Sequence, residues 1–524
     1  MSRVPGSEFL HTPASEVIPS PEGETWQRVI VVSNRLPFKV VTNGDGTPTL
    51  LKSAGGLVTA MSPLLHEGGT GKWIGWPGTV EEEGLEEALR SKPNGSFDVG
   101  VVGLTPEEEK GYYEGYSNEV LTPLLTGQMD QVDLEKAERY WPIYQQVQRK
   151  FAHKIHEDLK PHDIVWIQDY HLMGVGKELL DLGIKQPVGY FLHTPFPTPE
   201  QFATLPQSTA LIRDLLSYDL LGFQTEAFKK NFLETVALLL PNAVIQEGED
   251  GTTISYATRT TRVGSFPISI DPQEFTRQRD AEDTQRHIKR LEQVLEANDV
   301  QMVFNVGRLD YSKGFYEELL AFDRMLEQHP ELIGKIVLYQ LVVPSREDIP
   351  AYKEYKEKIV ELARQINEKY KTAIVQEEES SDESSPRYRG RVVRQLHDSM
   401  GRARYIAHLH EAEIQSVPTL SDGMNLVAKE SAVVGGPSTV QILGEAAGAA
   451  EELGDYVLLI DPQDTQAYAD ALYRAYTMSD TERQERKEKM AATVTENDVF
   501  SWWSQDQEPM FQAIWDKKAG VKKN

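Results

Sequence analysis

The 524-residue sequence contains no cysteine and no long apolar run. Without cysteine, disulfide bonds, thiol nucleophiles and thiolate-bound metals are excluded. A membrane helix needs about 18 consecutive apolar residues, and a secretory signal needs an apolar segment near the N-terminus; the sequence has neither. We therefore expect a cytoplasmic protein that has no membrane partner.

Positive charge is also scarce. Lys and Arg number 54 against 81 Asp and Glu, which gives a net charge of −27. Such an excess repels nucleic acids and anionic membranes, so we expect no nucleic-acid partner. An anionic substrate would need a local basic pocket that overcomes the field of the whole protein.

Several common catalytic motifs are missing. The sequence has no HExxH zinc motif, no GxSxG nucleophile motif and no paired DxD carboxylates in a setting that suits a metal. We therefore expect no metal and no other cofactor.

The chain is too long for one ordinary hydrophobic core, which predicts two large domains. Predicted strands alternate with helices, the pattern of an α/β protein with mostly parallel sheets. The pattern restarts after an extended, proline-containing segment at 265–272, which we interpret as an interdomain hinge. The predicted parts are a disordered lead-in at 1–25, α/β domains at 26–268 and 269–480, and C-terminal helices at 481–515 that pack back on the first domain.

The segment 303–314, VFNVGRLDYSKG, combines a strand, a turn and a helix start. Arg308 and Lys313 lie in the turn, where backbone N–H groups and the helix dipole favour an anion. Two fixed cations suit a diphosphate. Alternatively, Arg308 pairs with Asp310 and Lys313 is a solvated surface group. Helical spacing marks one apolar face in the residues that follow: Phe315, Leu319, Phe322 and Leu326.

Polar side chains follow three other predicted strands, at 28–33, 163–167 and 187–193. Arg35, Asp169 and His193 lie at these ends, and ligands of parallel α/β sheets bind beyond the carboxyl ends of the strands. This shared placement makes the three residues candidates for a site. The alternative for His193 is a structural residue with satisfied hydrogen bonds.

Two further stretches allow two interpretations each. Gly55 and Gly56 open a predicted helix and could let the backbone approach a phosphate, or they could form a plain tight turn. The stretch 112–118, YYEGYSN, could bind a sugar or phosphate through hydroxyl donors, or could be a wet surface loop.

In the stretch 421–430, SDGMNLVAKE, Asp422 is predicted at a helix start, with Glu430 farther along the helix. One carboxylate could bind sugar hydroxyls and the other a ribose, with backbone N–H groups for phosphate between them. Alternatively, Asp422 is only an N-cap and Glu430 only a salt-bridge partner.

Eight motifs together resemble the trehalose-6-phosphate synthases, in the same order from about residue 27 to about 505. They are SNRLP at 33–37, SAGGL at 53–57, YYEGYSN at 112–118, QDYHLM at 168–173, FLHTPFPTPE at 191–200, GRLDYSKG at 307–314, PSRED at 344–348 and SDGMNLVAKE at 421–430. The resemblance implies a GT-B fold, with two Rossmann-like domains facing each other across a central cleft and a C-terminal helix crossing back to the first domain. It also implies a retaining glucosyltransferase that moves glucose from a nucleotide sugar, with UDP-glucose expected, to glucose 6-phosphate.

For the donor, the resemblance implies that Arg308 and Lys313 hold the diphosphate and that the backbone at Gly55 and Gly56 closes over it. Asp422 and His193 would bind donor glucose hydroxyls, and Glu430 the ribose. The backbone between the two carboxylates would complete the donor site, through Gly423, Met424, Asn425, Leu426 and Val427.

For the acceptor, the resemblance implies that Arg35, Tyr113 and Arg346 bind the phosphate and that Asp169 lies near the sugar. Arg308, Lys313, His193 and Asp169 would be the catalytic residues, without a general base, because the leaving phosphate can itself take the acceptor proton.

Two positions depart from the family. Thr122 stands where a Trp usually lines the acceptor pocket, and Ser421 stands where an Arg usually precedes Asp-Gly-Met-Asn. Two alternatives therefore stay open: glucosyl transfer to another small phosphate, such as glycerol 3-phosphate, and a non-catalytic sugar-phosphate-binding regulator. The sequence decides neither the donor nucleotide, among UDP, ADP and GDP, nor whether the chain forms a homo-oligomer.

Overall fold

A computed structural model describes most of the chain. The described residues are 26–42, 48–52, 57–58, 60–61, 71–78, 98–248, 251–345, 350–371 and 391–519. The predicted lead-in at 1–25 and the predicted site residues Gly55, Gly56 and Arg346 lie outside these ranges.

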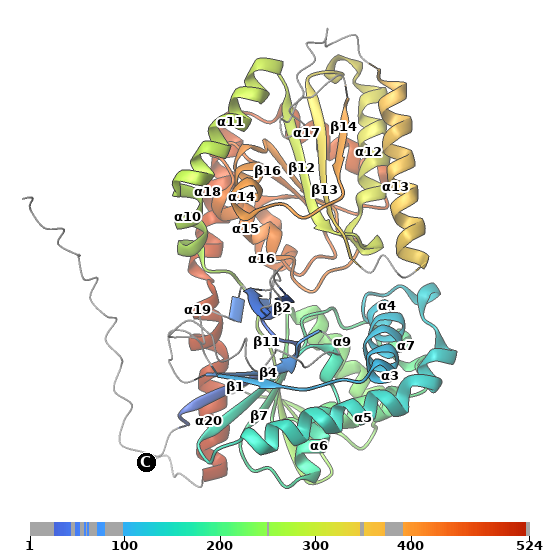
Figure 1. Cartoon of the computed structure of the whole chain (residues 1–524), viewed down its shortest axis with the longest axis vertical. Coiled ribbons are helices and arrows are strands. Elements are labelled where there is room, and N and C mark those ends of the chain that lie inside the picture. The colour runs from blue at the N-terminus through green and yellow to red at the C-terminus, as the bar shows by residue number, and fades with distance from the viewer. Residues whose placement is uncertain are drawn as a thin grey trace, which may run out of the picture.

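The described residues form two lobes, each built around a sheet (Figure 1). The sheet of the N-terminal lobe has the order β5-β4-β1-β6-β7-β8-β11-β10-β9. Its strands run parallel from β5 to β11, and β10 and β9 continue as antiparallel neighbours at one edge. The strands are β1 Arg28–Arg35, β4 Lys72–Trp76, β5 Asp98–Val101, β6 Asp163–Gln168, β7 Val188–Phe191, β8 Leu220–Phe223, β9 Val244–Gly248, β10 Gly251–Tyr256 and β11 Arg259–Ser265. A separate hairpin pairs β2 Phe38–Thr42 with β3 Pro48–Lys52.

The sheet of the C-terminal lobe is parallel throughout, in the order β14-β13-β12-β15-β16-β17. Its strands are β12 Gln301–Arg308, β13 Ile336–Val343, β14 Val393–Leu396, β15 Ile414–Val417, β16 Val440–Gly444 and β17 Leu458–Ile460. These two sheets confirm the predicted α/β class. The predicted domain boundaries stay predictions.

Helices pack around both sheets. In the N-terminal lobe they are α3 Pro106–Glu108, η1 Glu109–Leu121, α4 Thr122–Leu125, η2 Met129–Gln131, α5 Leu134–Asp158, η3 Tyr170–Leu172, α6 Val175–Asp181, α7 Pro199–Ala203, α8 Ser208–Leu215 and α9 Glu226–Leu239. In the C-terminal lobe they are α10 Pro272–Asp280, α11 Glu282–Asn298, η4 Tyr311–Lys313, α12 Phe315–Gln328, η5 Pro330–Leu332, α13 Pro350–Lys369, α14 Arg402–Glu411, α15 Leu426–Val434, α16 Ala450–Leu453, η6 Gly454–Tyr456, α17 Thr465–Thr477 and α18 Asp480–Glu496.

The apolar face predicted after Gly314 is confirmed, because all four of its residues are buried on α12. The wet-loop interpretation of 112–118 is wrong. This stretch lies within the π-helix η1, and Tyr112, Gly115, Tyr116 and Asn118 in it are buried. π-Helical turns are rare, and those that occur are often at functional sites. The helix η1 therefore remains a candidate part of the site.

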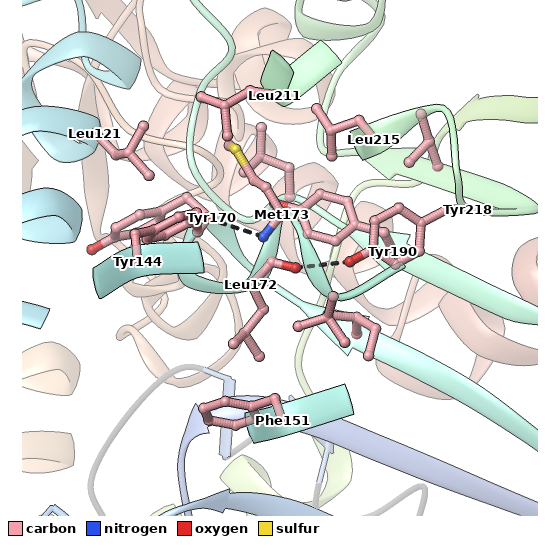
Figure 2. Packing of buried hydrophobic residues seen from close by; sticks show 14 of the residues in the cluster. Leu121, Tyr144, Phe151, Tyr170, Leu172, Met173, Tyr190, Leu211, Leu215 and Tyr218 are labelled. Atoms are coloured by element: carbon pink, nitrogen blue, oxygen red, sulfur yellow. Dashed lines mark hydrogen bonds between the residues drawn. The ribbon is translucent and has the colours of Figure 1, made fainter. Parts of the chain in front are cut away.

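One core cluster of the N-terminal lobe joins strands of the sheet to helices that include α5, α6 and α8. Figure 2 shows part of this cluster. Two of its buried tyrosines, Tyr144 and Tyr218, form hydrogen bonds with backbone atoms through their hydroxyl groups. Tyr144 accepts a hydrogen bond from the Met173 N–H at 3.2 Å, and Tyr218 donates one to the Leu172 carbonyl at 2.7 Å. These bonds fix the segment that follows Asp169, since buried hydroxyl groups without partners would cost free energy.

The C-terminal helices connect the two lobes (Figure 1). After α18 come α19 Val499–Ser501, η7 Trp502–Gln507 and α20 Glu508–Ala519. The Phe511 ring packs over Gly189 of β7, where an added Cβ atom would lie 2.3 Å from the ring. Together with the Trp166–Trp502 ring contact, this confirms that the C-terminal helices return to the first lobe. Within the described ranges, no helix is long and apolar enough to cross a bilayer.

Candidate active site

The turn after β12 is shaped by short-range hydrogen bonds. Asp310 accepts bonds from the backbone N–H and the hydroxyl of Ser312, at 2.9 and 2.8 Å. Gly314 has a φ of +69°, and a Cβ atom there would lie 1.8 Å from the Pro418 carbonyl oxygen. Only glycine fits at this position. The turn is therefore packed tightly against the loop that leads to Asp422.

The two predicted cations of this turn differ in their surroundings. Lys313 forms an ion pair with Asp422, with 2.6 Å between Nζ and Oδ2. Arg308 is exposed and has no ion pair within the described part of the chain. The alternative in which Arg308 pairs with Asp310 is therefore wrong, because the Asp310 carboxylate is turned toward Ser312 instead.

Asp422 does not begin a helix, which corrects the prediction and its N-cap alternative. Helix α15 starts at Leu426, and its N-cap is Asn425, whose side chain accepts a bond from the Ala428 N–H. Asp422 instead binds Lys313 and accepts a 3.0 Å bond from the Asn425 amide. Asn425 can take the left-handed conformation, with a φ of 72°, that redirects the chain into the helix.

The lobes touch where Gly423 meets His193. A Cβ atom on Gly423 would lie 1.6 Å from the His193 carbonyl oxygen, so the two backbones are in direct contact. Met424 is buried, whereas Leu426 and Val427 at the start of α15 are half-buried. The predicted donor backbone at 423–427 therefore lies directly beside the end of β7.

Glu430 is buried at 8% exposure and accepts a hydrogen bond from the Tyr405 hydroxyl. Burial raises the pKa of Glu430, and the nearby Arg402 guanidinium opposes this shift. The simple salt-bridge alternative is wrong, because the partner is a tyrosine. This carboxylate is held in place inside the lobe and keeps acceptor capacity for a ligand hydroxyl.

His193 is held by two buried glutamines. Its Nε2 lies 2.9 Å from Gln168 Oε1, and its Nδ1 lies 3.2 Å from Gln224 Nε2. An amide oxygen only accepts and an amide nitrogen only donates, so the ring is neutral with its proton on Nε2. Burial also lowers the pKa of His193 to about 3. A bond to a donor hydroxyl therefore requires His193 to share or exchange one of these contacts.

Asp169 has a strained backbone, with a φ of 74° and a ψ of 165°. For a residue other than glycine this costs of the order of 1–3 kcal/mol and is typical of functional sites. Its carboxylate accepts a 3.3 Å bond from the His193 N–H. Burial raises the pKa of Asp169 to about 6, and the charge of Arg308 opposes the shift. This electrostatic interaction links the N-terminal lobe to the turn after β12.

Arg35 lies between aromatic rings and forms no ion pair with the residues that the structure describes. Its guanidinium carbon is 3.8 Å from the centre of the Trp76 ring and 4.8 Å from that of Tyr113. Cation–π contacts of this kind hold an arginine without neutralising it. The predicted acceptor groups Arg35 and Tyr113 thus lie together.

The aromatic group continues toward Asp169. The Tyr113 ring stacks with His171, and His171 stacks with Tyr170, with centroid distances of 6.0 and 3.9 Å. Thr122, one of the two departures from the family, lies 3.1 Å from the Tyr170 hydroxyl through Oγ1. A polar contact therefore stands at the position where the resemblance implies an indole ring.

Sequence reasoning missed four groups around the site. Gln168 ends β6 and Gln224 directly follows β8, so the strand-end rule that selected Asp169 could have found them. Trp76 ends β4 and pairs in register with Arg35 of β1. Tyr405 comes from the middle of α14 and carries no signal in the sequence. Among the described residues, no group of three or more His, Asp or Glu could hold a metal ion.

A family model described as Glycosyltransferase family 20 matches residues 27–510. The chain belongs to glycosyltransferase family 20. This confirms the family implied by the ordered motifs.

Relatives in this family cover nearly the whole chain. The chain is 32% identical to alpha,alpha-trehalose-phosphate synthase [UDP-forming] 2 of Aspergillus niger, over 92% of this chain and 96% of that protein. It is also 31% identical to the corresponding UDP-forming enzyme of Schizosaccharomyces pombe, over 91% of this chain and 89% of that protein.

Several solved structures share the fold of this chain. The trehalose-6-phosphate protein from E. coli bound with UDP-2-fluoro glucose is 32% identical, with a TM-score of 0.79 over 93% of this chain and 99% of that chain. A UDP-forming synthase of Burkholderia xenovorans in complex with glucose-6-phosphate is 28% identical, with a TM-score of 0.80 over 92% of this chain and 99% of that chain. The GT-B fold implied by the resemblance is thereby confirmed.

Proposed function

We propose that this family 20 glycosyltransferase moves glucose from UDP-glucose to glucose 6-phosphate, giving α,α-trehalose 6-phosphate with retention at the anomeric carbon. The observation that carries the proposal is the junction of the lobes. There Gly423 contacts His193, and Arg308 acts electrostatically on Asp169. Two anionic substrates can meet at this junction despite the acidic surface.

On the donor side, Arg308 and Lys313 hold the diphosphate and neutralise the charge that develops on it as the bond to glucose breaks. Lys313 must exchange Asp422 for the diphosphate, which frees the Asp422 carboxylate for a glucose hydroxyl. Glu430, presented by Tyr405, accepts from the ribose. Gly55 and Gly56 stay predictions for the backbone that closes over the phosphates.

On the acceptor side, Arg35 and Tyr113 receive the sugar phosphate. Asp169 accepts a hydroxyl of the acceptor sugar next to the reacting centre. The leaving phosphate takes the proton of the attacking hydroxyl on the same face, which gives retention without a protein nucleophile. Arg346 stays a prediction for the phosphate.

A second acceptor is favoured by one observation. Thr122 and Tyr170 place hydroxyl groups where the resemblance implies a Trp, and a smaller, more polar wall suits a shorter phosphate such as glycerol 3-phosphate. The acceptor therefore has to be tested directly.

The experiment follows UDP release from UDP-glucose with glucose 6-phosphate, with glycerol 3-phosphate, and with neither acceptor. We expect release with glucose 6-phosphate and a product that is still phosphorylated. Release only with glycerol 3-phosphate would replace the acceptor assignment. Release with neither acceptor, while UDP still binds, would leave a sugar-phosphate-binding regulator.

A further inference from the structure

The segment between β11 and α10 is held by side chains from both lobes at a single residue, Ile268. Gln224, which follows β8 in the N-terminal lobe, accepts a 2.9 Å hydrogen bond from the Ile268 N–H through Oε1. Lys429 of α15 in the C-terminal lobe donates a 2.9 Å bond to the Ile268 carbonyl through Nζ. Gln224 and Lys429 are 2% and 1% exposed, so neither bond is exchanged with bulk water.

Gln224 also contacts a residue of the candidate site, and Lys429 lies on the helix that carries another. The bond from Ile268 fixes the orientation of the Gln224 amide, so that its Nε2 faces His193 Nδ1 and donates to it. Lys429 is the neighbour of Glu430 and pairs with Glu452 of α16, with 2.5 Å between Nζ and Oε2. A continuous set of buried contacts thus runs from His193 through Gln224, Ile268 and Lys429 to α15.

We propose that Gln224 and Lys429 are positioning residues that clamp the backbone of Ile268, one through its N–H and the other through its carbonyl, and that this clamp couples the tautomer and orientation of His193 to the placement of α15. The proposal deepens the proposed glucosyl transfer and rests on it for its effect on turnover. Neither residue touches a substrate.

Such a coupling is needed because the residues of the candidate site come from two different lobes. His193 comes from the N-terminal lobe, whereas Asp422 precedes α15 and Glu430 lies within it in the other lobe, and the polypeptide passes between the lobes at this segment. The Ile268 N–H and carbonyl belong to two adjacent planar peptide groups joined at the Ile268 Cα. A shift of α15 that pulls on the carbonyl would therefore also displace the N–H that is bonded to the Gln224 amide. Because rearrangement would leave buried polar atoms without partners, the clamp favours one relative placement.

The test compares Gln224→Leu, Lys429→Met and the double variant with two control variants. Gln507→Leu removes a buried glutamine that donates to the Trp502 carbonyl and has no bond to Ile268. Lys487→Met removes a buried lysine that donates to the Ala432 carbonyl of α15 but does not reach Ile268. Measurements are kcat, the KM for each substrate, and UDP affinity by calorimetry, which does not depend on turnover.

We expect each clamp variant to lower kcat about tenfold and to weaken UDP binding about threefold, with the acceptor KM within about twofold of wild type. The double variant should be no worse than the more damaged single variant, because both substitutions cut the same connection. The controls should leave kcat and UDP affinity within about twofold. Losses that multiply in the double variant, or controls that lower kcat equally, would overturn the proposal.

Gln224→Glu provides a readout that survives if the larger substitutions prevent folding. The carboxylate can still accept from the Ile268 N–H but cannot donate to His193 Nδ1. We expect the imidazole nitrogen NMR signals to show a proton on Nε2 only in the wild type and a proton on Nδ1 in the variant. Wild-type protein with a proton on Nδ1, or a variant with unchanged signals, would overturn the coupling even if UDP-glucose proves not to be the donor.

Discussion

The donor side and the acceptor side of the site differ in how they hold their charges. In the C-terminal lobe, Lys313 is paired with Asp422, and Glu430 accepts a hydrogen bond from Tyr405. These residues of the donor-substrate site therefore already have protein partners before a ligand binds. In the N-terminal lobe, Arg35 rests on the rings of Trp76 and Tyr113. Aromatic faces position a cation without neutralising it, whereas a carboxylate competes with an incoming phosphate.

This difference predicts that binding the donor costs more free energy than binding the acceptor. The acceptor phosphate meets an arginine that is already available, and the donor diphosphate must first break an ion pair. Part of the donor's binding energy is therefore used to release Asp422, which then becomes available to glucose. The four variants below test this difference, from the largest expected effect to the smallest.

Lys313→Ala removes the cation that we assign to the leaving diphosphate. We expect kcat/KM to fall about 10²–10³-fold, because charge developing in the transition state loses a preorganised partner. Initial rates of UDP release at varied UDP-glucose concentrations measure kcat/KM, and circular dichroism checks that the fold is retained. A folded variant with full activity would remove Lys313 from the donor site.

Arg35→Lys keeps the charge but loses the planar group that lies over Trp76. We expect the KM for glucose 6-phosphate to rise about 10–30-fold, with little change in the KM for UDP-glucose, because lysine cannot stack or bind a phosphate in two places. Steady-state kinetics with each substrate varied separately gives the answer. An equal rise in both KM values would mean that the two sides are not distinct.

Asp422→Asn tests the competition on the donor side directly. Asparagine cannot pair with Lys313, so we expect UDP to bind about fivefold more tightly, as suits the loss of a partly exposed ion pair. Glucosyl transfer should nevertheless slow, since a glucose hydroxyl loses a charged acceptor. Calorimetric titration with UDP that shows weaker binding would contradict the idea that Asp422 competes with the diphosphate.

Asp169→Asn tests how burial of the Asp169 carboxylate affects the stability of the fold. This carboxylate accepts a bond from the His193 N–H in one lobe and interacts with the charge of Arg308 in the other. Its folded pKa of about 6 lies above its usual 3.8, so the charged form destabilises the fold increasingly as pH rises through this window. The variant should be more stable than wild type by about 1–2 kcal/mol above pH 6, and this difference should disappear below pH 4. Urea unfolding at several pH values measures it, and a stability difference independent of pH would argue against burial as the cause.

Sequence periodicity predicted most of the fold because the signal is local. The four apolar residues of α12 recur at helical spacing, and the strands of both sheets are short buried runs. The π-helix η1 could not be predicted in this way. Its polar aromatic residues have no helical apolar stripe, and they are buried by contacts with α5 from elsewhere in the chain.

The sequence predicted which residues belong to the candidate site better than it predicted which of them contact one another. Strand ends and the turn after β12 selected Arg35, Asp169, His193, Arg308 and Lys313. The Lys313–Asp422 pair joins residues 109 positions apart and depends on the packing of Gly314 against Pro418. The same is true of the start of α15, where Asn425 replaces Asp422 as the cap. Such long-range contacts produce no repeating pattern of residues that could be recognised in the sequence.

A crystal structure of the protein with UDP and glucose 6-phosphate would test the central claim most directly. The account predicts that diphosphate oxygens contact Arg308 and Lys313, that Asp422 is released from Lys313, and that the sugar phosphate contacts Arg35. A complex in which Lys313 stays paired with Asp422 and the diphosphate binds elsewhere would contradict it.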